Sequence, residues 1–361
     1  MKPSPALLLP GISEEAILRW MVLFLALLIG GVAGFCAVVI AQMLMNLAKK
    51  YGRGDTSRFG GVVIVSFFFL SQLWLHGVSG LIQMSTPLAI VTAASLIIFV
   101  FGVAQEVFGF LSLTKIFGLL FAYFAAAIGL AIQGGAEVLY LGLHAQMMPM
   151  WAAYVCSVLM LVYPVFAFNT ANGSDGLVPS LCIFTIMGLL PLNLGAISYL
   201  LSLVAIGCVI FMMFNITVGR IYIGSGGTYF LGTLLGFTFL YAQTLPNVDV
   251  AYVLCLFFYP NANLLYSLIR RRLKGKALFG DDNGHLHNLI YRRLSSIPLF
   301  GRQSNTLTGL SVAFTFACLP MLLGRSELAV NWWVVYGVMW LGYVFLYRLF
   351  NITDLRELHF A

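Results

Sequence analysis

The stretch from Gly195 to Phe214 reads GAISYLLSLVAIGCVIFMMF and contains no charged residue. An α-helix needs about 20 apolar residues to cross the hydrocarbon core of a bilayer, and this stretch has 20 residues. A helix also satisfies its backbone hydrogen bonds internally, as the lipid interior requires. The stretch therefore predicts a transmembrane helix, and similar stretches recur along almost the whole chain.

The composition of all 361 residues agrees with a membrane protein. Hydrophobic residues make up 61% of the chain and charged residues 9%, and the mean hydropathy is +0.98. A soluble domain carries about 25% charged and about 45–50% apolar residues. The polar surface is too small for a water-exposed globule, which excludes a cytosolic enzyme, a secreted disulfide scaffold and a disordered chain. The net charge of +7 lies mostly in short loops, so we expect no nucleic-acid partner.

We expect an all-α polytopic integral membrane protein with ten or eleven transmembrane helices, forming a single transmembrane domain over residues 1–361. The candidate spans are 18–46, 61–75, 86–104, 112–132, 150–168, 176–191, 195–214, 228–243, 250–269, 306–323 and 330–350.

The basic residues predict the orientation of these spans. Alternating the spans places sixteen lysines and arginines on one side and only Lys2, Arg19 and Arg325 on the other. Loops rich in lysine and arginine face the cytoplasm. We therefore expect an inner-membrane protein with its N-terminus outside, its C-terminus in the cytoplasm and a cytoplasmic loop at 270–305. The polar segments of the chain gather at this side, which predicts a cleft that faces the cytoplasm.

The strongest of these segments runs Asn169-Thr-Ala-Asn172-Gly-Ser-Asp175-Gly176. If the segment is helical, its two asparagines and the aspartate lie on one face. Such a face offers amide donors and a carboxylate to a nucleotide, a phosphate or a cation. The alternative is a polar turn between spans, because Asn-Gly and Asp-Gly pairs favour turns. The spacing alone leaves both interpretations open.

Three further candidates lie on the same side. The glycine-rich segment Gly224–Thr228 precedes an apolar helix, whose N-terminal N–H groups can bind a phosphate; the alternative is a flexible connector. The segment Asp281–His287 carries two histidines beside paired carboxylates, which suit phosphate or metal binding; the alternative is a solvated loop. Glu106 ends the third span, where an acid suggests function; the alternative is a helix-end residue that reaches water.

In this order the segments resemble the polyprenyl-phosphate N-acetylhexosamine-1-phosphate transferase superfamily, which includes phospho-N-acetylmuramoyl-pentapeptide transferase. Arg58-Phe-Gly60-Gly61 is similar to the family's basic loop ending in Arg-x-Gly-Gly. The segment 169–176 matches its Asn-x-x-Asn-x-x-Asp-Gly signature, 224–232 resembles its glycine segment, and 271–288 resembles its histidine loop.

The chain departs from the family pattern mainly at acidic positions. Gln105-Glu106 stands where the family has Asp-Asp. Ser225 stands where the family has an aspartate that the resemblance implies is a magnesium ligand. In the histidine loop, Asn283 replaces an arginine and Asn288 replaces a third histidine.

The resemblance implies transfer of a sugar-1-phosphate from a UDP-sugar to undecaprenyl (polyprenyl) phosphate with release of UMP. This step would initiate a cell-envelope polysaccharide or glycoconjugate. Membrane-embedded dimers are common among the relatives, so the resemblance also implies a homodimer as one candidate assembly. Asp175 and Ser225 would hold Mg²⁺ or Mn²⁺. The implied catalytic residues are Asp175, Glu106, Asp282, His285 and His287, with both histidines on the pyrophosphate. The implied substrate-binding residues are Asn169, Asn172, Lys50, Arg58, Lys115, Gly224, Ser225 and Gly226.

The missing aspartates support a second interpretation from a different class. The chain would then be a catalytically degenerate relative that binds lipid phosphate or nucleotide-sugar, or that partners an active transferase. A transporter is less favoured, because the spans carry almost no charge away from their ends. Divalent-metal-dependent release of UMP separates the first two interpretations.

Overall fold

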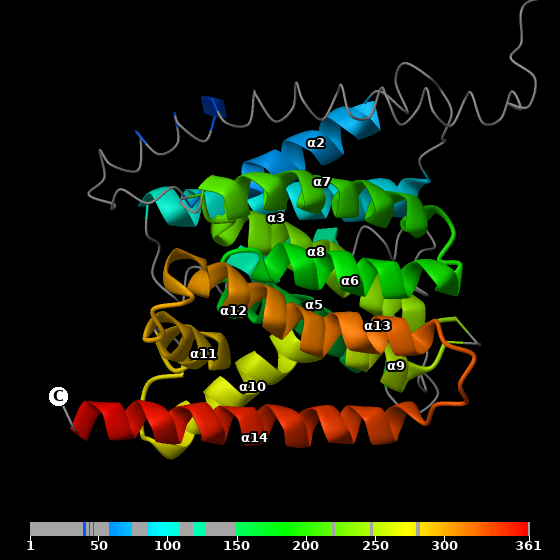
Figure 1. Cartoon of the computed structure of the whole chain (residues 1–361). Coiled ribbons are helices and arrows are strands. Elements are labelled where there is room, and N and C mark those ends of the chain that lie inside the picture. Colours follow the sequence, from blue (N-terminus) through cyan, green and yellow to red (C-terminus); the bar gives the residue numbers. More distant parts are fainter. Residues whose placement is uncertain are drawn as a thin grey trace, which may run out of the picture.

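The computed structural model describes residues 39–40, 43, 46, 58–73, 85–108, 118–123, 125–126, 149–218, 221–245, 248–278 and 282–359. This part of the chain is helical, with helices running side by side in stacked layers (Figure 1). Its principal helices are α2 (Gly61–Leu73), α3 (Thr86–Phe108), α5 (Met150–Thr170), α6 (Leu177–Leu189), α7 (Ala196–Val218), α8 (Gly224–Gln243), α9 (Val250–Leu256), α10 (Phe258–Leu273), α11 (Leu286–Ser295), α12 (Ser304–Ala313), α13 (Leu319–Gly324) and α14 (Trp332–His359).

Nine of the eleven predicted spans coincide with helices, while spans 18–46 and 112–132 lie mostly outside the described residues. Within the described residues, four stretches are long and apolar enough to cross a membrane: Leu88–Phe108, Ala196–Ile216, Ser304–Gly324 and Trp332–Asn351. A fifth is added if the bent pair α9–α10 counts as one span. The apolar helices α2 and α6 and the apolar part of α5 are shorter than this test requires.

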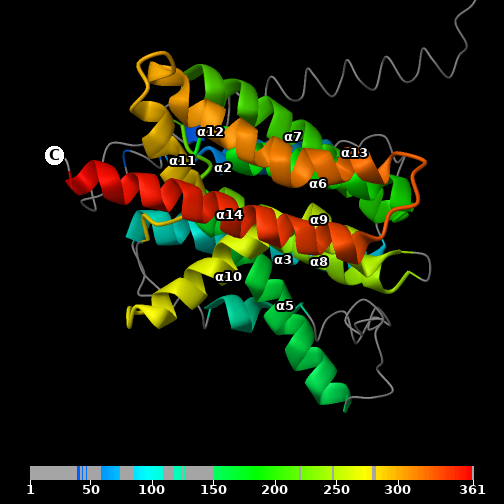
Figure 2. The same cartoon turned by 60° about the horizontal axis from the view of Figure 1, so that its bottom comes forward.

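The predicted span 250–269 is broken at Phe257 rather than straight. Helices α9 and α10 meet there at 77°, and α10 runs obliquely to its neighbours (Figure 2). Pro260 explains the break, because proline has no N–H to donate to the carbonyl of Leu256 and its ring collides with that carbonyl in a straight helix. The freed carbonyl oxygen of Leu256 instead accepts a hydrogen bond from the Thr185 hydroxyl at 2.9 Å.

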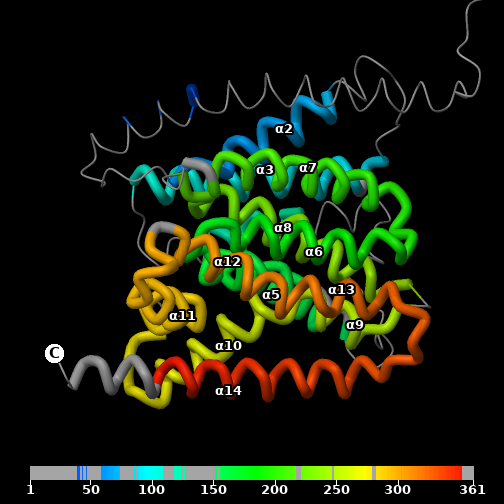
Figure 3. The backbone as a smooth tube through the Cα atoms, viewed as in Figure 1, coloured from blue at the N-terminus to red at the C-terminus, as the bar shows by residue number. Residues whose placement is uncertain are grey.

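Helix α8 lies at the centre of the bundle and packs against α2, α3 and α5 (Figure 3). Nearly all of its side chains are buried. Its glycines let neighbouring backbones approach closely, as is common between membrane helices. A Cβ added at Gly61 of α2 would lie 2.3 Å from the Cα of Gly227, so neither position has room for a side chain.

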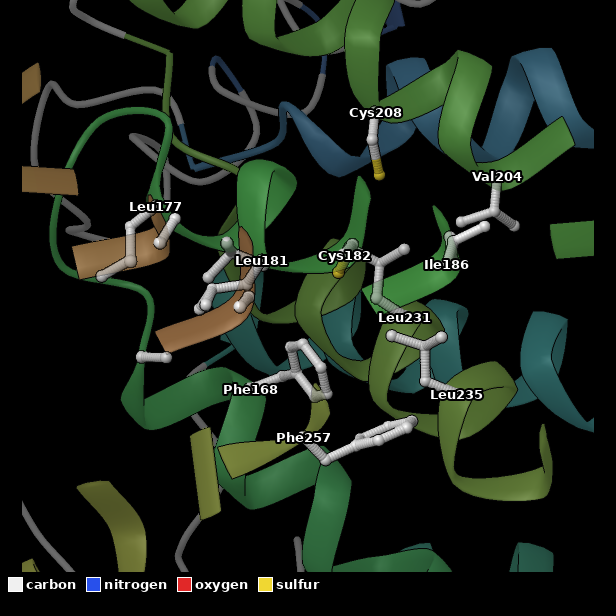
Figure 4. Close-up of a cluster of buried hydrophobic side chains, with 14 of the residues drawn as sticks. Phe168, Leu177, Leu181, Cys182, Ile186, Val204, Cys208, Leu231, Leu235 and Phe257 are labelled. Carbon is white, nitrogen blue, oxygen red and sulfur yellow. The ribbon is translucent and has the colours of Figure 1, made fainter. Parts of the chain in front are cut away.

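The hydrophobic core positions the turn between α5 and α6. Phe168 at the end of α5 and Leu177 at the start of α6 are both fully buried. They belong to a cluster that also includes Cys182 of α6, Leu231 of α8 and Phe257 (Figure 4). The polar residues 169–176 are therefore held between two anchored hydrophobic side chains.

Candidate active site at the α5–α6 turn

The Asn-rich segment is a turn and not a continuous helical face. Helix α5 ends at Thr170 and α6 begins at Leu177. Gly176 has φ +73°, a left-handed conformation that glycine adopts without strain and that interrupts a right-handed helix. The segment is thus a turn in conformation, which leaves its predicted binding role open, and Asn169 and Asp175 have different partners around it.

Asp175 is held by two asparagines from distant helices. Asn305 of α12 donates from Nδ2 to Oδ2 of Asp175 at 2.7 Å, and Asn215 of α7 donates to Oδ1 at 3.3 Å. Asn215 also accepts the N–H of Gly176 at 2.6 Å, which fixes the turn. Asp175 is only 6% exposed, and burial raises the pKa of its carboxyl above the usual value despite these hydrogen bonds. No sequence motif points to Asn215 or Asn305, which lie next to the predicted cytoplasmic ends of spans 195–214 and 306–323.

Glu106 connects the end of α3 to the first turn of α8. Its Oε1 accepts hydrogen bonds from the N–H of Ser225 at 3.0 Å and from the Ser225 hydroxyl at 2.7 Å. Arg58 approaches from the segment before α2, with Nη1 4.0 Å from Oε2 of Glu106. The Arg58 side chain is 63% exposed and therefore accessible to an anion.

The segment that contains Arg58 is bound directly to the glycine segment. The N–H groups of Gly60 and Gly61 donate to the carbonyls of Tyr222 and Ile223, each at 2.8 Å. Gly224 has φ +71°, and a Cβ there would collide with the carbonyl of Arg58. Two segments that the sequence identified separately, more than 160 residues apart, thus lie side by side.

Asn169 joins the α5–α6 turn to α8, because its Oδ1 accepts a hydrogen bond from the Thr228 hydroxyl at 3.0 Å. Tyr222 lies near both Asp175 and Arg58. Burial raises the pKa of the Tyr222 phenol, the negative charge of Asp175 raises it further, and the positive charge of Arg58 opposes this. Asp175 and Arg58 are thus both within electrostatic range of Tyr222. Asn172 is half-buried in the turn.

His287 is buried against the α5–α6 turn. It is 1% exposed, and its Nδ1 lies 2.9 Å from the Tyr259 hydroxyl. A Cβ added at Gly173 would come within 2.2 Å of His287 Nε2, so the two residues are in direct contact. Burial lowers the pKa of His287 to about 3, so the imidazole is neutral at pH 7. Contact of His287 with pyrophosphate stays a prediction, and a neutral ring would make that contact through a hydrogen bond and not through a positive charge.

His285 and Asp282 form a second polar group beside this histidine. The two imidazole rings stack at 5.5 Å. Asp282 pairs with Arg270 and accepts the Ser267 hydroxyl and the Gly284 N–H. Burial opposes ionisation of Asp282, but these hydrogen bonds and the nearby positive charges together lower its pKa to about 2. Burial also lowers the pKa of His285 to about 4, against the attraction of Asp282. Asp282 is an ionised partner of Arg270, and His285 is neutral at pH 7.

Hydrogen bonds and an ion pair thus connect five of the predicted site residues: Asn169, Gly224, Ser225, Glu106 and Arg58. Asp175 belongs to the same α5–α6 turn, and His287 contacts that turn at Gly173. Gly226 packs against α3 in the first turn of α8. Lys50, Lys115 and Asp281 lie outside the described residues.

Comparisons with known proteins identify similar sequences. Residues 88–243 match glycosyl transferase family 4. Phospho-N-acetylmuramoyl-pentapeptide-transferase of Moorella thermoacetica is 28% identical over 145 residues, which are 38% of this chain and 44% of that protein. These matches support the superfamily of polyprenyl-phosphate sugar-phosphate transferases.

Two further members are similar to the chain. Decaprenyl-phosphate N-acetylglucosaminephosphotransferase of Mycobacterium tuberculosis is 27% identical over 267 residues, 64% of each chain. Undecaprenyl-phosphate alpha-N-acetylglucosaminyl 1-phosphate transferase of Thermotoga maritima is 24% identical over 170 residues, 47% of this chain and 50% of that protein. The chain thus spans between about half and two thirds of the length of these superfamily members. The membrane-length apolar helices and the similarity to this superfamily together support a multi-pass membrane protein.

Proposed function

We propose that the protein transfers a sugar-1-phosphate from a UDP-sugar to a polyprenyl phosphate, with undecaprenyl phosphate as the expected acceptor. An oxygen of the lipid phosphate attacks the β-phosphorus of the UDP-sugar. The bond from that phosphorus to the bridging oxygen breaks, and UMP leaves with the oxygen. The product is a polyprenyl diphosphate sugar, which would begin a cell-envelope polysaccharide or glycoconjugate.

The observation that carries this proposal is the contact of Glu106 with Ser225. The family resemblance expects a carboxylate at position 225, and the serine there provides none. Glu106 places a carboxylate oxygen 2.7 Å from the Ser225 hydroxyl and 3.0 Å from its N–H. A negative charge thus lies at the first turn of α8, supplied by α3. This compensation favours a working site over the degenerate relative that the missing aspartates suggested.

Magnesium is part of the proposal, and the residues present fit it. Asp175 is buried, its hydrogen bonds come from neutral amides, and no lysine or arginine of the described chain forms an ion pair with it. Mg²⁺ is held by one or two carboxylates with substrate phosphates and water. No three His, Cys, Asp or Glu side chains gather within the described residues, so Asp175 would hold the ion, with Glu106 as the acid beside the predicted ligand Ser225. When bound, the ion neutralises negative charge on the two reacting phosphates.

The other residues would bind and orient the two substrates. Arg58 would contact an anionic group at the membrane surface, because it is exposed and lies beside Glu106. Asn169 would face the nucleotide or sugar, in the orientation set by Thr228. His287 would act on the site indirectly, by holding the turn through Gly173.

The test is release of UMP by the purified full-length protein with undecaprenyl phosphate, a panel of UDP-sugars, and magnesium or manganese. The control variant is Asp175→Asn. Metal ions typically supply several kcal/mol of transition-state stabilisation, so we expect the variant to lose at least about 100-fold in rate. Absence of UMP release with every donor, in folded protein that binds undecaprenyl phosphate, would overturn the proposal in favour of a non-catalytic lipid-phosphate binder.

A further inference from the structure

A cavity of about 600 Å³ lies where α10, α11 and the C-terminal part of α14 converge (Figure 1). Pockets that hold small ligands usually measure about 300–1,000 Å³. Asp282 is the one residue that the cavity shares with the predicted catalytic set. The cavity is therefore a separate space beside the candidate active site.

The lining of this cavity is strongly basic. It contains five cationic side chains and one acidic side chain: Arg270, Arg271, Lys274, Lys276, Arg292 and Asp282. Arg270 pairs with Asp282. Among the described lining residues, cations thus outnumber acids five to one, and such a concentration of like charge is stabilised when an anion enters.

The cavity is preformed by hydrogen bonds. Arg270 donates from Nη1 to the carbonyl of Gly284 at 2.6 Å and to the Tyr347 hydroxyl at 2.9 Å, which ties α10 to the 282–284 loop and to α14. The Nε of Arg271 donates to the carbonyl of Ala277 at 2.6 Å. These bonds hold two of the cations in place without a ligand.

The helices that line the cavity also expose apolar side chains outside it. Ile269 and Leu273 of α10 and Leu349 of α14 are exposed and are not part of the lining. The basic residues also belong to the side of the membrane that the charge bias predicts to be cytoplasmic. A basic cavity between helices with exposed apolar side chains suits a molecule that has an anionic head and a hydrophobic tail.

We propose that this cavity binds the phosphate headgroup of an anionic membrane lipid. The cations meet the phosphate, and the exposed apolar residues of α10 and α14 meet the lipid chains. Inorganic phosphate carries the same anionic group but has no acyl chains, so an experiment can distinguish it from a phospholipid as the ligand. The proposal does not depend on the transferase activity.

The test uses native mass spectrometry of the full-length protein, purified in detergent and titrated separately with phosphatidylglycerol, phosphatidylcholine and inorganic phosphate. The double variant Lys274→Gln/Lys276→Gln and the single variant Arg292→Gln remove cations from the lining. Arg272→Gln and Arg293→Gln are matched controls, because each removes an adjacent arginine that does not line the cavity.

We expect the wild type to retain phosphatidylglycerol in preference to phosphatidylcholine. The lysine double variant should bind phosphatidylglycerol at least about 10-fold more weakly, since each basic residue contributes to attraction of an anionic lipid. The two controls should stay within about 2-fold of wild type, and added salt should weaken wild-type binding. Equal losses in lining and control variants would overturn the cavity as the site. Binding of inorganic phosphate without preference for phosphatidylglycerol would overturn the lipid as the ligand.

Discussion

Glu106 and Ser225 form a double hydrogen bond between the end of α3 and the start of α8, in which one carboxylate oxygen accepts both the backbone N–H and the hydroxyl. The two residues are 119 positions apart in the chain. The contact ties two segments of the site together and determines where a negative charge lies. It also shows how a site can keep a carboxylate after the expected residue is replaced.

This contact predicts the behaviour of two variants. Glu106→Gln keeps an acceptor for Ser225 but removes the charge, so we expect UMP release to fall by at least about 10-fold, as for loss of one electrostatic contact in a site. Exchange of the acid, in the double variant Glu106→Ser/Ser225→Asp, should restore part of the loss. Steady-state rates with magnesium measure both. An unchanged rate in Glu106→Gln would show that the charge has no part in the reaction.

The buried histidines predict a loss of stability in acid. The pKa of His287 is lowered to about 3 and that of His285 to about 4, from an unperturbed value of 6.5. Between pH 6.5 and 4 the unfolded chain therefore binds more protons than the folded chain, and stability falls as the pH falls. Asp282, with a pKa of about 2, contributes only below this window. Asp175 acts in the opposite sense at the acidic end, because its pKa is raised.

The apparent melting temperature of the full-length protein at pH 7 and pH 5 measures this effect. We expect a lower melting temperature at pH 5. His287→Asn removes one of the two titrating groups. The difference in melting temperature between pH 7 and pH 5 should therefore be smaller in the variant than in the wild type, whatever the variant's stability at pH 7. An equal change in melting temperature between pH 7 and pH 5 in the variant and the wild type would contradict the assignment to His287.

The close contact of α2 with α8 predicts that Gly61→Ala is destabilising. The added Cβ would lie 2.3 Å from the Cα of Gly227, so the two helices must separate. Forced overpacking typically costs about 1–3 kcal/mol, and we expect a clearly lower melting temperature. Gly337→Ala on α14 is the matched control, since nothing lies within 4 Å of a Cβ there. Equal melting temperatures for the two variants would show that α2 and α8 are not in this contact.

The break between α9 and α10 predicts a role for the Thr185 hydroxyl. Thr185→Val removes the hydrogen bond to the carbonyl of Leu256, which Pro260 leaves without a helical partner. An unsatisfied buried carbonyl costs about 1–3 kcal/mol, so the melting temperature should fall. Thr315→Val is a suitable comparison, because Thr315 is exposed and its hydroxyl bonds only within its own helix. A similar effect in both variants would contradict the role proposed for Thr185.

The sequence predicted the helices better than their paths. Hydropathy detects apolar length, and nine spans coincide with helices of the described residues. A hydropathy window does not register direction, so the bend at Phe257 was missed although Pro260 signals it. The same limit applies to α2 and α6, whose apolar helices are shorter than a full span.

For the candidate site, motifs identified segments that lie together in the structure, but not every contact between them. The spacing of Asn169 and Asp175 does not reveal Asn215 and Asn305, because these lie on helices that only tertiary packing brings to Asp175. Burial of His287 was equally invisible, since a His-x-His pattern has the same letters whether the rings face solvent or the interior. Glu106 was identified, whereas its contact with Ser225 depends on how α3 packs against α8.

The α5–α6 turn is attached at three places, through Asn169 to α8, through Gly173 to His287, and through Asp175 to α7 and α12. A segment held in this way has little conformational freedom left to lose when a ligand arrives. The turn is therefore preorganised, and the entropic cost of binding falls mainly on the substrates. Rigid compounds that match the turn as it stands would keep that advantage, and flexible analogues would forfeit it.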